Sequence, residues 1–237
     1  VGAHKRAPPL PQTMAGFVLT EEGPTDGREN MARDAALLER AEDGERLCRV
    51  YRWTGPWVSL GYWQRPERDL LPGNPVPWVA RPTGGKAVLH GHDVTVGLAW
   101  PLADLAEPGE DPATLSRSVR RVYRRVVAPL VDALRSCGLP AALAEQTPFV
   151  ASAGRTADCF AHVSPNDVVD ERTGLKVCGC ALRISPRAVL VQASIPNGPP
   201  LVDPSLVFER PAVYSSHRWE DVPFAERLRE ALASRLA

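Results

Sequence analysis

The stretch RPTGGKAVLHGHDVTVGLAW, residues 81–100, begins as a loop and ends as an apolar strand. Two cations, Arg81 and Lys86, flank a Thr-Gly-Gly triplet directly before the apolar run. Glycine adopts backbone conformations closed to other residues and lets a ligand approach the main chain. The exposed N–H groups of such a turn can hold an anionic or carbonyl oxygen. The pattern therefore predicts either a binding loop at the mouth of a buried hairpin or a plain hairpin turn with solvated cations.

Length and charge limit the possible classes of protein. A chain of 237 residues suits one sizeable domain, or one domain with a small appendage. Lys+Arg and Asp+Glu both number 28, so no broad nucleic-acid surface is predicted. No apolar run is long enough to span a bilayer, and VGAHKRAPPLPQ at the start has no apolar signal core. We therefore expect a cytoplasmic protein that binds neither nucleic acid nor membrane, with residues 1–15 as a flexible lead-in.

The five cysteines, an odd number without a secretion signal, argue against a disulfide framework.

Hydrophobic patterning predicts both strands and helices. Strands are expected over residues 16–20, 47–53, 57–61, 76–80, 175–184 and 188–195. Helices are expected from Thr25 or Asp26 to about residue 42, from about 114 to 138, and over 222–236, where leucines recur at 228, 232 and 236. Pro129 should kink or interrupt the second helix. Strands before and after a long central helix predict an α+β domain with a mixed, mostly antiparallel β-sheet packed with helices.

Several segments resemble, in the same order, the lipoate–protein ligase and octanoyltransferase family, which shares its catalytic fold with biotin–protein ligases. NMARDAALL (30–38) is similar to the opening helix of that family, WVSLGYWQ (57–64) to its second conserved strand, and RPTGGKAVLH to its signature loop. DCFAHVSPNDVV (158–169) and GLKVCGCALR (174–183) resemble the segment around its catalytic lysine. The resemblance covers about residues 28–196 and favours the binding loop. It implies a biotin/lipoate ligase-like catalytic domain over residues 16–200, followed by a short connection and helix over 201–237.

The resemblance assigns substrate-binding roles along the loop and on one later strand. In the family the loop lines the pocket for the lipoyl or octanoyl chain and the group that activates it. The positions implied here are Arg81, Thr83, Gly84, Gly85, Lys86, Ala87, Val88 and His90, with Gly179 and Ala181 on the later strand. The glycines would admit the acyl carbonyl and any phosphate to the backbone, and the two cations would hold negative charge.

Two further residues are implied as catalytic. Lys176 begins the pattern Lys-hydrophobic-x-Gly-x-Ala, and in the family that lysine faces the acyl carbonyl, where a cation stabilises charge on the oxygen. Cys159 is followed by Phe160 and lies 17 residues before Lys176, as in cysteine-dependent octanoyltransferases, whose cysteine forms a thioester with the acyl chain. A nearby ammonium group favours the nucleophilic thiolate. The alternatives are a solvated lysine and a buried structural cysteine. His162 is either a base for the thiol or a surface histidine.

Two positions differ from the family pattern. His90 is followed by Gly91 where the family has Asp, with Asp93 coming later, and Leu182 stands where the family has Gln.

A metal site and a docking helix are weaker possibilities. Cys178 and Cys180 with a histidine could suggest a metal site, but the spacing does not match structural zinc patterns, so no metal is expected. The arginines of the 114–138 helix form either a docking face for an acidic partner or a solvated face, and the second is the more common.

Three functions follow from these residues. In the first, octanoyl or lipoyl passes from an acyl carrier protein to Cys159 and then to a lysine of a lipoyl domain or of a glycine-cleavage H-type protein, with no cofactor. In the second, an ATP-dependent lipoate–protein ligase uses ATP and Mg, and Lys176 contacts an acyl-adenylate. Only about 40 residues follow the matched region, which favours the transferase over ligases with an additional C-terminal domain. In the third, suggested by the two differing positions, the protein binds an acyl chain or a lipoyl domain without turnover.

Overall fold

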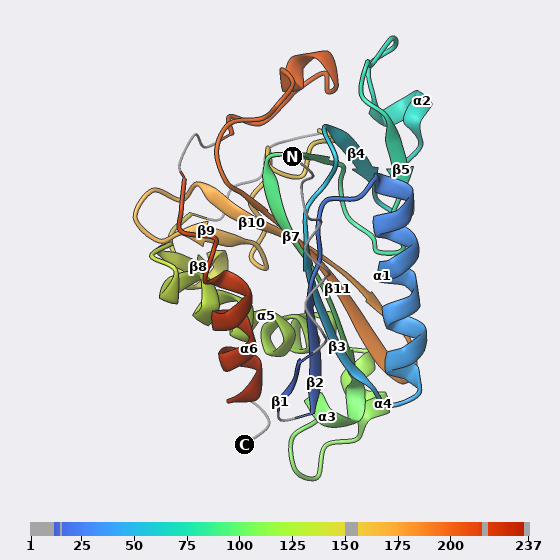
Figure 1. Ribbon diagram of the computed structural model, residues 1–237, viewed down its shortest axis with the longest axis vertical. Coiled ribbons are helices and arrows are strands. Elements are labelled where there is room, and N and C mark those ends of the chain that lie inside the picture. Colours follow the sequence, from blue (N-terminus) through green and yellow to red (C-terminus); the bar gives the residue numbers. More distant parts are fainter. Residues whose placement is uncertain (1–11, 15, 150–155, 215–217, 235–237) are drawn as a thin grey trace, which may run out of the picture.

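The structure, a computed structural model, describes residues 12–14, 16–149, 156–214 and 218–234 (Figure 1). Its strands form an eight-stranded sheet of order β1-β2-β3-β7-β11-β10-β9-β8 and a three-stranded sheet of order β5-β4-β6. The large sheet contains β1 (Gln12–Met14), β2 (Phe17–Glu21), β3 (Arg46–Tyr51), β7 (Asp93–Pro101), β8 (Ala141–Leu143), β9 (Val168–Asp170), β10 (Lys176–Ile184) and β11 (Ala188–Pro196). The small sheet contains β4 (Trp57–Leu60), β5 (Trp78–Ala80) and β6 (Val88–His90). Only the pairs β2/β3 and β4/β5 are parallel among these strands, which confirms the expected α+β fold with a mostly antiparallel sheet.

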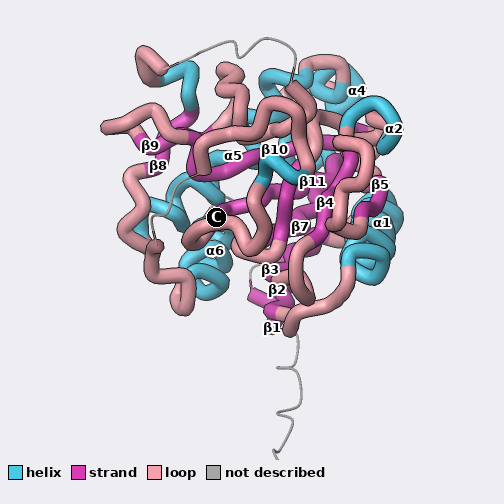
Figure 2. The backbone as a smooth tube through the Cα atoms, turned by 90° about the horizontal axis from the view of Figure 1, so that it is seen from above, coloured by secondary structure: helices cyan, strands magenta, loops and turns pink. Residues whose placement is uncertain are grey.

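Helices cover both faces of the large sheet. Helix α1 (Gly27–Glu42) packs on β7 and β11 along one face, and α5 (Val119–Ser136) and α6 (Phe224–Ala233) lie on the other (Figure 1). The tube view from above shows the same layers, with the small sheet beside α1 (Figure 2). The short elements are α2 (Pro66–Asp69), α3 (Leu102–Leu105), α4 (Pro112–Ser116), η1 (Ala144–Gln146) and η2 (Pro204–Leu206). The main core lies between the sheet and α5 and α6, where Phe17 and Trp100 meet edge to face at 4.8 Å.

The elements form where the local chemistry predicts them. Asp26 caps α1, since its side chain accepts hydrogen bonds from the backbone N–H groups of Arg28 and Glu29. The strands expected over 175–184 and 188–195 form as β10 and β11, which pair antiparallel on either side of a turn at residues 185–187. The C-terminal helix also forms, and its Leu228 and Leu232 are fully buried in the main core. The expected leucine at 236 lies outside the described residues.

The structure differs from several local expectations. Residues 81–100 do not form a hairpin, because β6 and β7 belong to different sheets and Gly91, at φ +113°, turns the chain between them. The helix expected over 114–138 is divided into α4 and α5 at Arg117 and Ser118. Pro129 was expected to kink or interrupt this helix, and it lies inside α5, which continues past it to Ser136, so the helix is not interrupted. Within the expected lead-in, residues 12–14 form β1 on the edge of the sheet, and the other residues of 1–15 lie outside the described part.

The arginines of α5 bond to glutamates of the same chain. Arg120 and Arg124 contact Glu145, and Arg121 and Arg125 contact Glu110. This pairing supports the solvated face and not a docking face. None of the described helices has the length and apolar character needed to cross a bilayer.

Candidate active site

A pocket lies where the small sheet meets the large one. Its apolar wall comes from Met31, Tyr51, Trp53, Val88, Ala181 and Ala193, and its polar wall from Ser59, Arg81, His90, Thr95, Gln192 and Ser194. Gly85, Cys159, Gly179 and Cys180 complete the lining. The glycine loop connects β5 to β6, which both pair with β4, so the loop is held at the rim of this pocket.

Arg81 holds the glycine loop in shape. Its guanidinium donates to the carbonyl oxygens of Gly84 and Lys86, each at 2.6 Å, and to that of Ser59 at 2.9 Å. The side chain is buried, and burial lowers the pKa of Arg81 to about 10, although the nearby Cys159 acts in the opposite direction. These hydrogen bonds position the loop. That the Arg81 guanidinium also binds a ligand directly stays a prediction.

The two glycines of the loop differ. Gly85 has φ +87° and lines the pocket, whereas Gly84 has ordinary φ and open space where a side chain would lie. Gly61, at the end of β4, packs so closely against the loop that a Cβ atom there would overlap the carbonyl oxygen of Gly85. The loop conformation therefore depends on main-chain contact at Gly61 as well as on its own sequence.

The segment after the glycine loop fixes the position of Cys159. The Ala87 N–H donates to the carbonyl of Ala157, and the Cys159 N–H donates to the carbonyl of Ala87, each at 2.8 Å. Asp158, between them, is buried and accepts hydrogen bonds from the N–H groups of Phe160 and Ala212. The cysteine is thus attached by backbone hydrogen bonds to the segment that lines the pocket.

Lys176 lies against Cys159. Its Nζ is 3.2 Å from the Cys159 Sγ and donates to the Cys159 carbonyl at 2.9 Å and to the His162 carbonyl at 3.3 Å. It also pairs with the Asp167 carboxylate at 2.8 Å. Burial lowers the pKa of Lys176, but Cys159 and Asp167 outweigh burial, so the net pKa lies above the ordinary value and the amine is an ammonium. The site therefore holds a cation directly beside a thiol on the pocket wall.

His90 on the polar wall belongs to a buried hydrogen-bonded chain. Its Nδ1 is 2.8 Å from Asp93 Oδ2, its Nε2 is 2.8 Å from Ser59 Oγ, and its ring stacks on Trp53 at 3.9 Å. Burial raises the pKa of Asp93, but His90 and the hydroxyl of Ser194 outweigh it, and the pKa lies well below its ordinary value. Asp93 therefore supplies a carboxylate to His90 even though Gly91 directly follows the histidine.

Gln192 brings an amide to the pocket from the neighbouring strand. It is the register partner of Ala181, accepts a hydrogen bond from Thr83 Oγ1 at 2.7 Å, and donates to Asp34 Oδ2 at 2.6 Å. Leu182, where the family pattern has Gln, packs against the main core. The pocket thus contains a glutamine from β11 instead.

The structure brings most of the predicted site residues together. Those that line the pocket are Arg81, Gly85, Val88, His90, Cys159, Gly179 and Ala181. Thr83, Gly84 and Ala87 support it through hydrogen bonds, and Lys176 reaches it through Cys159. Lys86 lines a separate surface hollow with Glu67 and Arg210. Sequence reasoning missed Asp167, Gln192, Ser59 and Asp34. Asp34, Ser59 and Asp167 each lie within a segment that resembles the family (30–38, 57–64 and 158–169), so their sequence positions were the available signal, whereas Gln192 lies outside these segments.

The remaining candidates have limited roles. Cys178 and Cys180 lie with their Sγ atoms 3.5 Å apart, and burial raises the pKa of Cys178. No group of three or more His, Cys, Asp or Glu side chains able to hold a metal ion occurs among the described residues. Burial, with Lys86 nearby, lowers the pKa of His162, and the backbone carbonyl of this residue accepts from Lys176.

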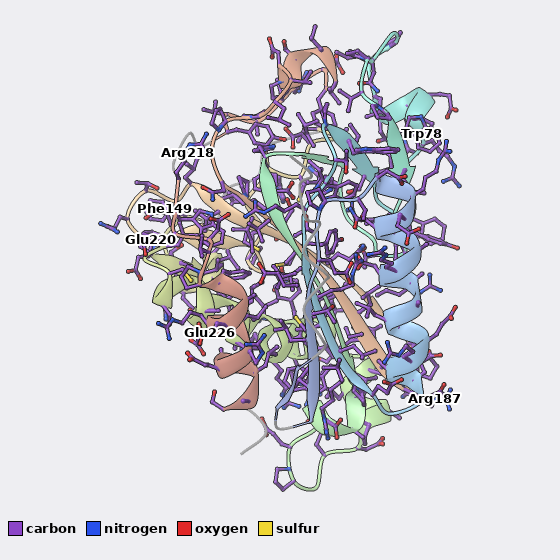
Figure 3. All side chains as sticks on the ribbon, viewed as in Figure 1. Trp78, Phe149, Arg187, Arg218, Glu220 and Glu226 are labelled. Carbon is purple, nitrogen blue, oxygen red and sulfur yellow. The ribbon has the colours of Figure 1, made fainter. Side chains whose placement is uncertain are left out.

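The ribbon with all side chains drawn as sticks shows the small sheet at the periphery of the molecule (Figure 3). Trp78, labelled there on β5, is 46% exposed and lies beside the start of α1. Trp78 does not line the pocket, to which the small sheet contributes Ser59 of β4 and Val88 and His90 of β6.

Comparisons with known proteins agree with this geometry. Residues 26–207 match the family described as lipoyl protein ligase A/B catalytic domain. Octanoyltransferase LipM of an Exiguobacterium species is 32% identical over 194 residues, which cover 78% of this chain and 66% of that protein. Octanoyltransferase LipM of Kyrpidia tusciae is 32% identical over 188 residues, covering 76% of this chain and 65% of that protein. The chain thus spans about two thirds of the length of these relatives.

Solved structures show the same fold at low identity. A bipartite lipoate protein ligase from Thermoplasma acidophilum, solved in a study that includes its E2 lipoyl domain, has a TM-score of 0.64 at 21% identity and covers 95% of this chain and 84% of that one. A lipoate-protein ligase A bound with ATP has a TM-score of 0.63 at 21% identity, and the match covers 94% of this chain and 86% of that one. Because the family match extends over most of the chain and the relatives reach this level of identity, the protein belongs to the lipoyl protein ligase A/B catalytic domain family.

Proposed function

We propose that this protein is an octanoyltransferase of protein lipoylation that works through a thioester on Cys159. The Cys159 thiolate attacks the carbonyl carbon of an octanoyl thioester on an acyl carrier protein. The carbon–sulfur bond to the carrier breaks, and the carrier thiolate leaves. The amine of a lipoyl-domain lysine then attacks the Cys159 thioester, an amide forms, and Cys159 leaves as a thiolate while the amine releases its proton.

One observation carries this proposal: the Lys176 ammonium lies 3.2 Å from the Cys159 Sγ on the wall of a partly apolar pocket. A neighbouring cation favours the thiolate that attacks, and it can stabilise the negative charge on the carbonyl oxygen in each tetrahedral intermediate. Amide formation from a thioester is downhill, so the reaction needs no cofactor.

The partners follow from the relatives. The name octanoyltransferase of the relatives supports an octanoyl donor, and the lipoate ligase studied with an E2 lipoyl domain supports a lipoyl-domain acceptor. An acyl carrier protein as donor and an H-type protein as a second acceptor rest on the family resemblance alone. The alternative function is that of an ATP-dependent ligase, because a lipoate-protein ligase A bound with ATP has the same fold. In that reading the loop and Lys176 would hold an acyl-adenylate, Mg would accompany the ATP, and Cys159 would be structural.

Intact-mass analysis separates these readings. The native protein mixed with octanoyl carrier protein, without acceptor, should gain one octanoyl group that hydroxylamine removes, because a thioester is labile to that reagent. Cys159→Ser should form no hydroxylamine-labile adduct. Cys180→Ser is the matched control, since Cys180 is the other cysteine that lines the pocket, and it should still be acylated.

The opposite results identify the alternatives. Full transfer by Cys159→Ser that requires ATP and octanoate would establish the ligase. No adduct and no turnover with either donor would establish a protein that binds without catalysis.

A further inference from the structure

A buried carboxylate that does not itself line the pocket contacts Lys176. Asp167 Oδ1 is 2.8 Å from Lys176 Nζ, and the two side chains are 7% and 3% exposed. The Asp167 Oδ2 accepts from the Ser164 N–H at 2.6 Å, and the Asp167 N–H donates back to the Ser164 carbonyl at 3.0 Å. The carboxylate is therefore held in place by its own turn, independently of the lysine.

Few charged groups surround the ammonium. On the loop that carries Cys159, Asp158 is also buried, but its oxygens bond to Phe160 N–H, Ala212 N–H and the Tyr214 hydroxyl. His162, on the same loop, presents a backbone carbonyl to Lys176, and on β10 itself Cys178 is a buried thiol whose pKa burial raises. Of the four acceptors that the structure places on Lys176 Nζ, two are backbone carbonyls, and only the Cys159 sulfur, as the thiolate of the proposed mechanism, and the Asp167 carboxylate can carry negative charge.

The reaction cycle removes one of these two anions. When Cys159 is acylated its sulfur becomes part of a neutral thioester, and the ammonium loses that counterion. A buried cation without a counterion is strongly disfavoured, and a buried lysine then gives up its proton. Yet the second half-reaction, attack by the acceptor amine, again creates an oxyanion that the ammonium must stabilise.

We propose that Asp167 is the permanent counterion of Lys176, and that it keeps the lysine charged while Cys159 is acylated. Asp167 is thus a positioning residue that acts through Lys176 and is needed most in transfer from the enzyme to the acceptor. The catalytic part of this inference rests on the proposed thioester mechanism. The inference that Asp167 keeps Lys176 protonated does not depend on that mechanism.

Single-turnover kinetics of Asp167→Asn test the catalytic part. Asparagine has nearly the same shape and can still accept from Ser164. Octanoylation of Cys159 should be slowed less than tenfold, because thiolate and ammonium still pair. Transfer from the isolated acyl-enzyme should fall on the order of 10²–10³, the usual loss when one oxyanion partner is removed. Acyl-enzyme should therefore accumulate in this variant.

The pH dependence distinguishes a charge role from a structural role. Without the carboxylate the pKa of Lys176 in the acyl-enzyme falls, so the ammonium returns as pH is lowered. The ratio of variant to native transfer rate should rise toward one at low pH, while protonation of the acceptor amine affects both proteins equally. Asp167→Glu should recover part of the rate, and Glu171→Gln, at an exposed carboxylate in the turn that follows β9, should match the native protein. Equal losses in both half-reactions with a ratio independent of pH would overturn the proposal.

A substrate-free measurement tests the charge relation even if the thioester mechanism fails. Cys159→Ala removes the thiolate as acylation does, and ¹⁵N NMR of the lysine side chain reports the protonation of Nζ directly. In Cys159→Ala, Lys176 should stay protonated at neutral pH. In Cys159→Ala with Asp167→Asn it should titrate about 1–3 pH units lower. Identical titration of the two folded proteins would overturn the proposal, whereas an absent octanoyl adduct on the native protein would instead refute the proposed function.

Discussion

The side chain of Lys176 is almost fully buried, and four acceptors lie within 3.3 Å of its amine. Cys159 and Lys176 could be chosen as candidates from the sequence because they occupy motif positions, and the structure brings their side chains together, while their catalytic roles stay predictions. Asp167 and Gln192 could not be assigned roles in advance. The partner of Asp167 is fixed by the pairing of β9 with β10, and that of Gln192 by packing against α1, neither of which is visible along the chain.

At the residue scale, Lys176→Ala should lower the transfer rate on the order of 10²–10³ because the oxyanion loses its cation. The measurement is single-turnover transfer of octanoyl to a lipoyl domain, with circular dichroism as the check on folding. Lys86→Ala provides the matched control, since Lys86 lies outside the pocket, and should leave the rate within about twofold. Near-native transfer by Lys176→Ala would remove the lysine from the mechanism.

Asp93 gives a prediction for stability against pH. Its folded-state pKa is depressed, so its ionised form stabilises the fold above its unfolded pKa of about 4, and that stabilisation is lost as pH falls through the folded pKa. Asp93→Asn should therefore lower the free energy of unfolding by about 1–3 kcal/mol at pH 7. In urea titrations the difference from the native protein should stay constant down to about pH 5 and shrink below pH 4. If the difference in the free energy of unfolding between the native protein and Asp93→Asn grew at low pH, His90 and Ser194 would not favour the ionised form of Asp93.

At the element scale, strands with clear apolar patterns and α1 with its Asp26 cap were predictable, whereas β8 and β9 were not. Each of these two strands has three residues, too few to establish a period of two. The assignment of β6 and β7 to different sheets also could not be read from the sequence. Gly91 is compatible with a tight hairpin and also with a turn that leads from one sheet into the other, so the sequence does not distinguish the two.

The two loop glycines provide a paired test. Gly85→Val should abolish binding of an octanoyl chain, since valine is strained at φ +87° and its Cβ would lie 3.1 Å from the Arg81 guanidinium. Gly84→Val, where there is open space and ordinary φ, should retain binding. Calorimetry with an octanoyl ligand measures both. Equal affinity of a correctly folded Gly85→Val protein would show that the loop is only a turn.

At the scale of the whole molecule, a buried polar chain connects the surface to the pocket. Arg49 is 2% exposed and contacts Glu22 at 2.7 Å and Asp34 at 2.6 Å. Asp34 in turn accepts from Gln192, which accepts from Thr83 of the glycine loop. The chain crosses from α1 through the large sheet to the small one. Its polar members Thr83 and Gln192 lie far in sequence from the charged ones, which is why composition and spacing could not reveal it.

Arg49→Met should lower the free energy of unfolding by about 3–5 kcal/mol, because Asp34 then becomes an unpaired buried carboxylate. Arg33→Met removes the other, half-exposed arginine that contacts Glu22 and should cost less than about 1 kcal/mol. Chemical denaturation of both variants measures the difference. Similar losses would indicate that the buried chain contributes little to the stability of the fold.

The contact between Gly61 and the carbonyl of Gly85 also sets a limit on evolution. At Gly85 and Gly179, which line the pocket, the atoms nearest to an added Cβ belong to side chains, so a smaller neighbour could make room. At Gly61 the obstructing atom is main chain, so no substitution of a neighbour can remove it. In a library with position 61 randomised and selected for transfer, surviving clones should encode glycine alone, even when the surrounding pocket is allowed to vary.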